Sequence, residues 1–238
     1  MKIAIIGYGK MGRFIEQIAL SRGHEIAAII KSDSPESEWK KLANANVAIE
    51  FSEPSAAVKN IYKCFEYNVP VAVGTTGWHD RLMEVRERCS KGGNTLMVAT
   101  NFSIGVNLFF HVNKIIAQVM ESLPEYNVSI EETHHTQKLD APSGTAISLA
   151  QGILSELSRK KQWKLAEKVT SNEDLSIKAY RKDDVPGTHI VTYTSAVDDI
   201  EIKHTAHNRQ GFAVGAVVAA EWLADKKGYF TMNDLIGF

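Results

Sequence analysis

Two histidines and a lysine lie close together near the middle of the chain. His134 and His135 are adjacent, and Lys138 follows three residues later. An imidazole with an ordinary pKa near ~6.5 can give or take a proton at neutral pH. A lysine ammonium can donate a proton or hold an anion. These residue types therefore indicate proton transfer on an anionic ligand.

A Pro-Ser-Gly-Thr turn follows directly, at residues 142–145. The backbone N–H groups of Ser143, Gly144 and Thr145 would open a helix, and the N-terminus of a helix favours negative charge. A substrate that carries carboxylates would then be held by these groups together with Lys138 and His135. We expect a small-molecule dicarboxylate as the ligand of this segment.

The flanking residues define the elements that must position this segment. Tyr126 to Ile130 alternates apolar and polar residues like a half-buried strand, and Ala146 to Leu154 has helical spacing of apolar residues. The polar residues between them are expected to form a loop that joins a strand to a helix, and that helix is expected to continue to about Lys161. Such loops commonly carry functional residues.

Other readings of the same residues are a metal site, a Schiff-base lysine and a surface loop without a role. No third ligand follows the two histidines at a zinc-like spacing, and His204 and His207 belong to a different strand end, so no metal site is predicted. Lys138 could form a Schiff base with a carbonyl substrate. The concentration of basic groups beside a glycine turn argues against an idle loop.

The N-terminal residues predict a dinucleotide-binding unit. The apolar strand Lys2 to Ile6 precedes a G-x-G-x-x-G sequence, and a helix to about Ser21 and a strand from His24 to Ile30 follow. In this context the glycines allow a tight turn, close approach of the backbone to a pyrophosphate and close packing of helix on strand. The cofactor-binding residues expected here are Gly7, Tyr8, Gly9, Lys10, Met11 and Gly12.

The end of the second strand bears on the choice of cofactor. An acid at this position normally binds the ribose hydroxyls of NAD, but here the strand is followed by Lys31 and Ser32. These two residues could pair with the 2′-phosphate of NADPH, although Lys31 could equally be a solvated loop residue. We favour NADPH and keep NADH as an alternative.

Three more strands are expected at residues 46–51, 69–73 and 95–99, and Ser52 is expected to cap the helix that follows the first of them. Ligands of open α/β sheets bind at the carboxyl ends of the strands, so the residues there are candidates for the nicotinamide site. They could also be ordinary turns capped by serine or threonine. The candidates are Gly74, Thr75, Thr76, Ala99, Thr100, Asn101 and Phe102.

The pattern changes after a long helix that begins near residue 104. Segments 175–181, 188–194 and 200–206 alternate with period two and are separated by turn residues, which indicates a mixed or antiparallel sheet. A helix from residue 212 to 223 is expected to pack back on the first domain. The predicted fold is α/β: a Rossmann-like domain of residues 1–103 and 213–238, and a second α+β domain of residues 104–212.

Composition narrows the class of protein. Of the 238 residues 44% are hydrophobic and 23% charged, as in ordinary soluble proteins, and the net charge of -1 gives no case for nucleic acid or an acidic membrane. Cys64 and Cys89 are expected to be free thiols in a reducing cytosol. No secretory h-region and no apolar run of ~20 residues is present, so a cytoplasmic location without a membrane span is predicted.

Residues 132–146 resemble the signature of one enzyme family. The pattern E-x-H-H-x-x-K-x-D-x-P-S-G-T-A matches them without a mismatch. Further matches are residues 7–12, 74–76, 99–103 and 204–215. On these motifs the chain resembles the dihydrodipicolinate reductases, also called 4-hydroxy-tetrahydrodipicolinate reductases, of bacterial lysine and diaminopimelate biosynthesis. The chain is shorter than many members between the second and third strands, and it lacks the acid after the second strand.

The resemblance implies a nucleotide domain joined by hinges to a substrate domain that forms a homotetramer. The implied reaction is reduction of 4-hydroxy-tetrahydrodipicolinate to tetrahydrodipicolinate, in which NADPH or NADH delivers a hydride to the unsaturated cyclic imine and the product is then protonated. By the same resemblance His134 is the proton donor and acceptor and Lys138 a second proton donor. His135, Gly144 and Thr145 would bind the substrate carboxylates.

Overall fold

The computed structural model describes residues 1–208 and 210–237, which fall into two compact units. The first holds residues 1–104 and 210–237, and the second holds residues 105–208. Arg209 and Phe238, which belong to the predicted substrate and nucleotide domains respectively, lie outside the described residues.

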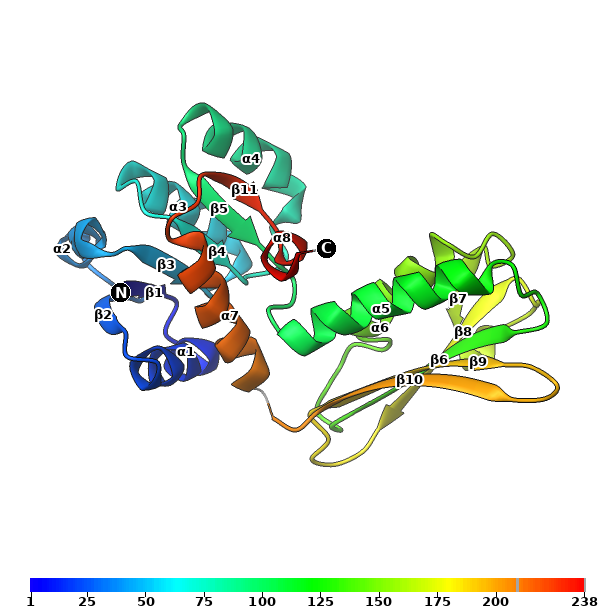
Figure 1. Cartoon of the computed structure of the whole chain (residues 1–238). Coiled ribbons are helices and arrows are strands. Elements are labelled where there is room, and N and C mark those ends of the chain that lie inside the picture. Colours follow the sequence, from blue (N-terminus) through cyan, green and yellow to red (C-terminus); the bar gives the residue numbers. More distant parts are fainter. Residues whose placement is uncertain (209, 238) are drawn as a thin grey trace. The chain divides into compact units, whose positions relative to one another are not determined.

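The first unit is built on a parallel sheet with the strand order β11-β5-β4-β3-β1-β2 (Figure 1). A parallel sheet is covered on both faces, which explains why its strands are short continuous apolar runs. The strands are β1 (Lys2–Ile6), β2 (Glu25–Ile30), β3 (Val47–Glu50), β4 (Val71–Val73), β5 (Thr95–Val98) and β11 (Gly228–Phe230).

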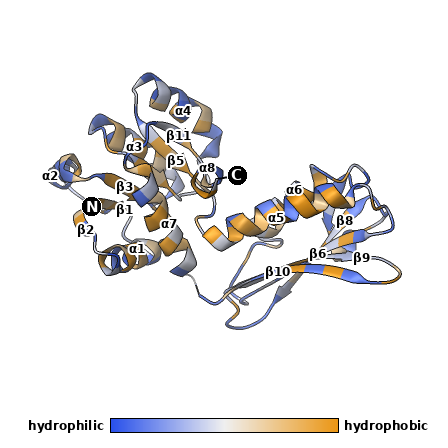
Figure 2. Ribbon diagram, viewed as in Figure 1, coloured by the Kyte–Doolittle hydropathy of each residue, from blue (hydrophilic) through white to orange (hydrophobic). Residues whose placement is uncertain are grey.

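Helices cover both faces of this sheet. Alternate residues of β1 point to opposite sides: Ile3 and Ile5 pack with α1 and α7, whereas Ala4 and Ile6 pack in the core that includes α3 and α4. The colouring of Figure 2 shows this apolar interior between polar outer surfaces. The helices are α1 (Lys10–Ser21), α2 (Glu36–Trp39), α3 (Pro54–Glu66), α4 (Leu82–Lys91), α7 (Gln210–Leu223) and α8 (Met232–Ile236), with short 3-10 turns at Lys40–Asn44 and His79–Arg81.

The Rossmann-like parallel sheet predicted from the sequence is confirmed, with one local error. Ser52 was expected to cap the helix that follows β3, but α3 begins at Pro54 and its N-cap is Glu53. The Ser52 hydroxyl instead donates to the buried carboxylate of Glu50. Cys64 and Cys89 are buried free thiols, as predicted.

The second unit holds a mixed sheet with the order β10-β9-β6-β8-β7. Strand β6 pairs antiparallel with β9 and parallel with β8, and helices α5 and α6 pack on one face of the sheet (Figure 1). This confirms the predicted second sheet. Its elements are α5 (Ile104–Met120), β6 (Asn127–His134), α6 (Gly144–Leu154), β7 (Gln162–Leu165), a 3-10 turn (Ala166–Lys168), β8 (Asp174–Arg181), β9 (Gly187–Thr194) and β10 (Asp199–Ala206).

Two elements of this unit differ from the prediction. Strand β6 runs on to His134, so residues 131–134 are strand and not loop. Residues 131–133 pair with both neighbouring strands, and His134 pairs with β8. Alternation buries Glu132 and His134 and leaves Glu131 and Thr133 half-exposed. The predicted helix to about residue 161 ends at Leu154, and the unpredicted β7 follows it.

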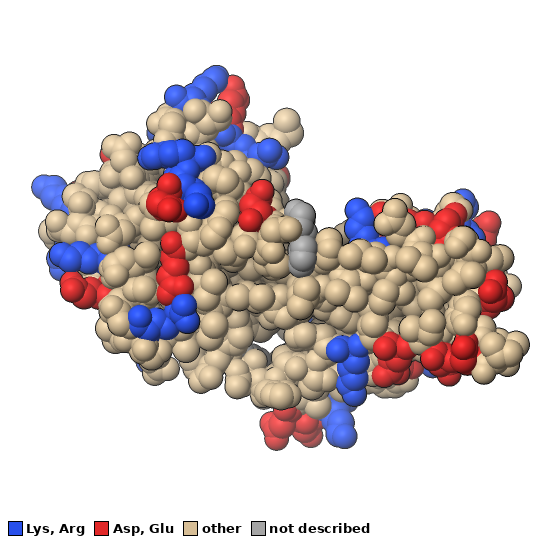
Figure 3. Space-filling view, viewed as in Figure 1, with Lys and Arg blue, Asp and Glu red and all other residues tan. Residues whose placement is uncertain are grey.

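The surface carries charge of both signs. On the face in Figure 3, blue lysine and arginine atoms are interspersed with red aspartate and glutamate atoms. Among the described residues, no helix combines the length and apolarity required to cross a bilayer.

Candidate active site

Two positions in the glycine turn between β1 and α1 have room for no residue other than glycine. Gly7 has φ +92°, and a β-carbon there would lie 2.0 Å from the carbonyl oxygen of Phe51. A β-carbon on Gly12 would lie 2.2 Å from the carbonyl oxygen of Gly7. Gly9 is the N-cap of α1 and faces open space, so the N–H groups of the first turn are accessible to a phosphate. The turn therefore fits the pyrophosphate of a dinucleotide.

A hollow at the carboxyl ends of β1, β3 and β4 adjoins this turn. It brings together six of the predicted cofactor residues, and three that the prediction missed, Phe51, Ser52 and Pro54. The missed residues follow β3, so the rule that ligands bind at the ends of parallel strands could have found them. The predicted residues that line the hollow are Gly9, Lys10, Met11, Gly74, Thr75 and Thr76.

Buried polar groups hold the floor of this hollow. The Glu50 carboxylate accepts hydrogen bonds from the Ser52 hydroxyl and, at 3.1 Å, from Asn60 Nδ2. Burial raises the pKa of Glu50, and these hydrogen bonds offset part of the increase. The Ser52 N–H donates to Thr75 Oγ1 at 2.8 Å, which ties the end of β3 to the end of β4. Glu50 thus positions Ser52, which borders the hollow.

Lys31, one of the two residues predicted to read the adenosine ribose, lies over the ring of Tyr8. Lys31 Nζ lies 5.5 Å and Arg13 Cζ 5.7 Å from the centroid of its ring, and the Tyr8 hydroxyl donates to Glu16. Ser32 is exposed in the turn after β2. Arg13 was not predicted from the sequence, although it lies on the same end of α1 as the fingerprint. The cluster is cationic at the place where the acid typical of NAD enzymes is missing.

The predicted cofactor residues after β5 lie outside this hollow. Ala99, Thr100, Asn101 and Phe102 are not among the residues that line the hollow. The Phe102 side chain is buried, with its ring centroid 5.7 Å from that of Phe51. Phe102 can therefore present only backbone to a ligand, whereas Thr100 is exposed.

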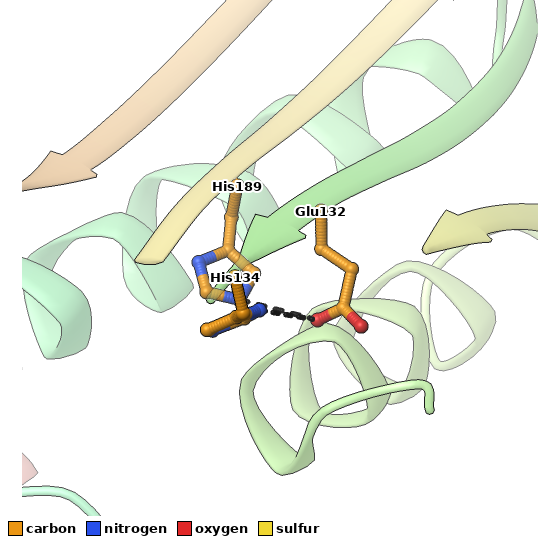
Figure 4. Close-up of side chains that lie close together, drawn as sticks. All are labelled: Glu132, His134 and His189. Atoms are coloured by element: carbon orange, nitrogen blue, oxygen red, sulfur yellow. Dashed lines mark ion pairs between the residues drawn. The ribbon is translucent and has the colours of Figure 1, made fainter. Parts of the chain in front are cut away.

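In the second unit, a buried cluster forms at the end of β6. Glu132 and His134 point to the same side because residues two apart in a strand share a face. His189 on β9 is the direct ladder partner of Glu132. Figure 4 shows the three side chains converging: Glu132 Oε2 lies 3.4 Å from His134 Nδ1 and 3.6 Å from His189 Nε2. The prediction missed His189 because strand pairing cannot be read from one sequence.

Burial and charge set the protonation of this cluster. Burial lowers the pKa of His134 to about 4, although the nearby carboxylate of Glu132 opposes the change. For Glu132 burial alone would raise the pKa, but the nearby His189 and Ser143 groups outweigh it and lower the pKa to about 2. At neutral pH the cluster therefore holds a carboxylate beside a neutral imidazole of His134.

Lys138 lies in the turn after β6. Its Nζ donates to both carboxylate oxygens of Asp140 at 2.8 Å, and this pairing lowers the pKa of Asp140. His135 lines a separate groove that also carries the carboxylates of Asp183 and Asp184. His135 is thus placed beside acids, which makes it a weaker anion site than the turn that follows.

The predicted turn caps α6 as expected, but the prediction for the Ser143 N–H is wrong: it donates to Glu132 Oε1 at 3.0 Å and is not open to a ligand. Ser143 is the N-cap of α6, and its hydroxyl accepts a hydrogen bond from the Ala146 N–H at 3.2 Å. Gly144 and Thr145 are the first residues of the helix, and a β-carbon on Gly144 would meet open space. The first turn of α6 therefore offers N–H groups to a carboxylate.

The buried cluster also bears on metal binding. One ligand atom from each of Glu132, His134 and His189 lies within 4.8 Å of the other two, a set that could hold a divalent cation. The prediction of no metal site was based on ligand spacing in the sequence, which does not reveal such a set. The guanidinium of Arg181 lies 3.4 Å from the Glu132 carboxylate and disfavours a cation there.

Family models match both parts of the chain. The model described as "Dihydrodipicolinate reductase, N-terminus" matches residues 1–102, and the model described as "Dihydrodipicolinate reductase, C-terminus" matches residues 105–236. The chain belongs to the dihydrodipicolinate reductase family. The resemblance noted in the sequence is therefore confirmed across both units.

Two similar proteins are both named 4-hydroxy-tetrahydrodipicolinate reductase. The chain is 50% identical over 236 residues to the 4-hydroxy-tetrahydrodipicolinate reductase of Christiangramia forsetii, with 99% of this chain and 98% of that protein covered. It is 35% identical over 267 residues to the 4-hydroxy-tetrahydrodipicolinate reductase of Archaeoglobus fulgidus, covering 99% of this chain and 100% of that protein.

Solved structures share the fold. A dipicolinate-bound dihydrodipicolinate reductase from Paenisporosarcina sp. TG-14 superposes with a TM-score of 0.81 at 23% identity, covering 97% of each chain. An amine dehydrogenase from Mycobacterium smegmatis superposes with a TM-score of 0.55 at 12% identity, covering 97% of this chain and 94% of that chain. The fold of the dihydrodipicolinate reductase family is thus shared with another dehydrogenase.

Proposed function

We propose that this chain reduces 4-hydroxy-tetrahydrodipicolinate to tetrahydrodipicolinate in the route to diaminopimelate and lysine. The observation that carries the proposal is the segment from β6 to the start of α6, which holds Glu132, His134, Lys138 and the Ser143 turn in one short stretch. The family models and the similarity to reductases over nearly the whole chain support the same activity.

The chemistry divides between the two units. A nicotinamide dinucleotide bound at the glycine turn would supply a hydride to the unsaturated ring. In the second unit, Lys138 is a proton donor for the carbanion-like carbon that hydride addition creates. His134 is neutral at neutral pH, so its part is to accept a hydrogen bond or a proton from the ring. Loss of water from the 4-hydroxy substrate leaves the unsaturated imine, and hydride plus proton then completes its two-electron reduction.

Substrate carboxylates would be bound at the start of α6. The N–H groups of Gly144 and Thr145 provide hydrogen-bond donors, and the helix dipole adds attraction of about 0.3–1 kcal/mol for a negative group. Lys138 supplies a cation close in sequence to this turn, and we propose His135 as a further contact. These donors favour a planar dicarboxylate over a neutral imine or aldehyde.

We propose NADPH as the preferred cofactor, with NADH also accepted. The supporting observation is the cationic cluster of Lys31 and Arg13 around Tyr8, together with the exposed Ser32. Guanidinium and ammonium groups pair with a 2′-phosphate, whereas a ribose with a free 2′-hydroxyl gains less from them.

We also propose that the protein assembles as a homotetramer through its second unit. Helix α5 leaves large apolar side chains exposed in this chain, Leu108 at 47%, Ile115 at 47% and Val119 at 58%. Their spacing of seven and four residues places them on one stripe of the helix. Light scattering would give four times the chain mass of 26.4 kDa if the proposal holds, and the chain mass itself if it fails.

A steady-state assay with enzymatically generated substrate tests the function. Loss of the reduced-nicotinamide absorbance should depend on both substrate and enzyme. Pyridine-2,6-dicarboxylate, a planar dicarboxylate, should inhibit competitively with the substrate. Absence of NADPH and NADH oxidation would overturn the proposal, and turnover that ignores the dicarboxylate would assign the chain to another imine or aldehyde.

A further inference from the structure

Glu132 is the centre of the polar network in the second unit. Its side chain is fully buried, and its Oε1 accepts a 3.0 Å hydrogen bond from the Ser143 N–H. The Arg181 guanidinium lies 3.4–3.5 Å from the same oxygen. The second oxygen, Oε2, lies within 3.6 Å of both His134 and His189 (Figure 4). One carboxylate thus contacts four groups from three different elements and the turn before α6.

Two buried atoms in this network face each other without another partner. Glu132 Oε2 and His134 Nδ1 make no hydrogen bond to any described residue, and they lie 3.4 Å apart. An unpaired buried polar atom is unfavourable, so a small rotation that pairs the two is favoured. The Nδ1 edge of His134 therefore pairs with Glu132.

The opposite edge of the His134 ring faces a glycine. A β-carbon placed on Gly187 would lie 3.1 Å from His134 Nε2 and 3.3 Å from its Cδ2. Glycine at this first residue of β9 therefore leaves the Nε2 edge uncrowded by a side chain. Nε2 is the nitrogen of His134 that remains for a ligand.

We propose that Glu132 is a positioning residue that fixes His134 in the tautomer with the proton on Nδ1, and that links this imidazole to the anion-binding turn of α6. The inference rests on the proposed function, which supplies the substrate that His134 and α6 would share. A hydrogen bond at one ring nitrogen decides the proton state of the other. With its proton on Nδ1, His134 offers the substrate a lone pair at Nε2, and Lys138 remains as the proton donor.

The link to α6 passes through Ser143. The Ser143 N–H donates to Glu132 Oε1, and the Ser143 hydroxyl caps α6 while it contacts His189 Nε2 at 3.2 Å. His189 lies edge-on to His134 with ring centroids 5.0 Å apart, so it fills the space behind the imidazole. Removing the Glu132 charge should therefore disturb both proton transfer and carboxylate binding.

The tautomer itself can be measured on the wild-type full chain. Nitrogen-15 shifts of labelled histidine distinguish the two neutral tautomers and the imidazolium, and His134→Gln identifies the His134 signals. We expect the Nδ1–H tautomer of His134 at neutral pH, after dialysis against a chelator that removes adventitious metal. The Nε2–H tautomer, or an imidazolium, would overturn the proposal. This measurement needs no turnover and no variant of Glu132, so it stays decisive if the proposed reaction is not observed.

Kinetics of Glu132→Gln provide the second test. Loss of the partner that orients a metal-bound histidine typically costs 10–100-fold; by analogy we expect kcat to fall by about that factor and KM to rise several-fold. The matched control is Glu131→Gln: Glu131 is the adjacent residue, lies on the other face of β6 and pairs with Lys178 at 3.5 Å. The control should stay within about twofold of wild type. A folded Glu132→Gln enzyme with unchanged kcat, KM and His134 tautomer would overturn the proposal.

Discussion

The backbone of Gly215 in α7 lies directly against the carbonyl group of Phe102. A β-carbon at position 215 would be 1.7 Å from that oxygen and 2.8 Å from its carbon, well inside van der Waals contact. Helix α7 therefore reaches the end of β5 only because position 215 has no side chain. This contact holds Phe102 in place, at the end of the segment 99–102 that was predicted to contact the cofactor.

We predict that Gly215→Ala destabilises the nucleotide unit by about 3 kcal/mol, since the backbone must shift to admit the methyl group. Gly211→Ala in the same helix is the control. Its β-carbon would lie 3.8 Å from Ser103 Oγ, an ordinary contact, and alanine gains up to about 1 kcal/mol in helix propensity. Urea denaturation followed by circular dichroism measures both. Equal stability of the two variants would contradict the close approach.

Lys138→Met should lower kcat by about 10²–10⁴-fold, because the variant removes the proton donor while keeping much of the side-chain volume. Lys178→Met is the control, since Lys178 pairs only with the half-exposed Glu131 among the interactions described for it. Steady-state rates with saturating cofactor and a denaturation curve for each variant separate chemistry from folding. A rate near that of wild type would remove Lys138 from the mechanism.

Lys31→Glu should weaken NADPH binding by about 10-fold or more and NADH binding by less than about threefold, because a carboxylate would face the 2′-phosphate in one cofactor only. Lys41→Glu changes the same charge at a site where lysine pairs with Glu38. Titration calorimetry of wild type and both variants with each cofactor gives four ratios of variant Kd to wild-type Kd. If NADPH and NADH weaken equally, Lys31 does not read the 2′-phosphate.

Stability should fall as the pH drops below the ordinary histidine range. Burial lowers the pKa of His134 from 6.5 to about 4, so between these values the unfolded chain binds a proton that the folded chain excludes. Stability is then lost as the pH falls, by roughly 1–2 kcal/mol between about pH 7 and about pH 5. Glu132 adds to the loss only below its ordinary value of 4.5, because its folded pKa is about 2.

The check is urea denaturation at both pH values for wild type and His134→Gln. The variant carries no titrating group at this position, so its stability should vary less with pH than that of wild type. Glutamine keeps hydrogen-bonding capacity near Glu132, which limits unrelated destabilisation. An unchanged pH dependence in the variant would assign the titration to another group.

Local patterns predicted much of this molecule. The glycine turn at Gly7 and the cap at Ser143 follow from backbone requirements that neighbouring residues reveal. The contacts around Glu132 could not be predicted in the same way, because His189 is 57 residues away and meets it through the ladder of β6 and β9. The polar residues 131–134 also looked like loop, since only the two flanking strands make them a strand.

The order of the strands has a consequence for synthesis of the protein. Strand β11 lies at the edge of the first sheet beside β5, and α7 covers the face formed by β1 and β3. Both elements follow the entire second unit in the chain. During synthesis the second unit can therefore complete its core first. Until then the apolar face of residues 1–104 around Ile49 and Met97 is not covered by α7. Nascent chains halted before residue 210 would expose that face to chaperones and to aggregation.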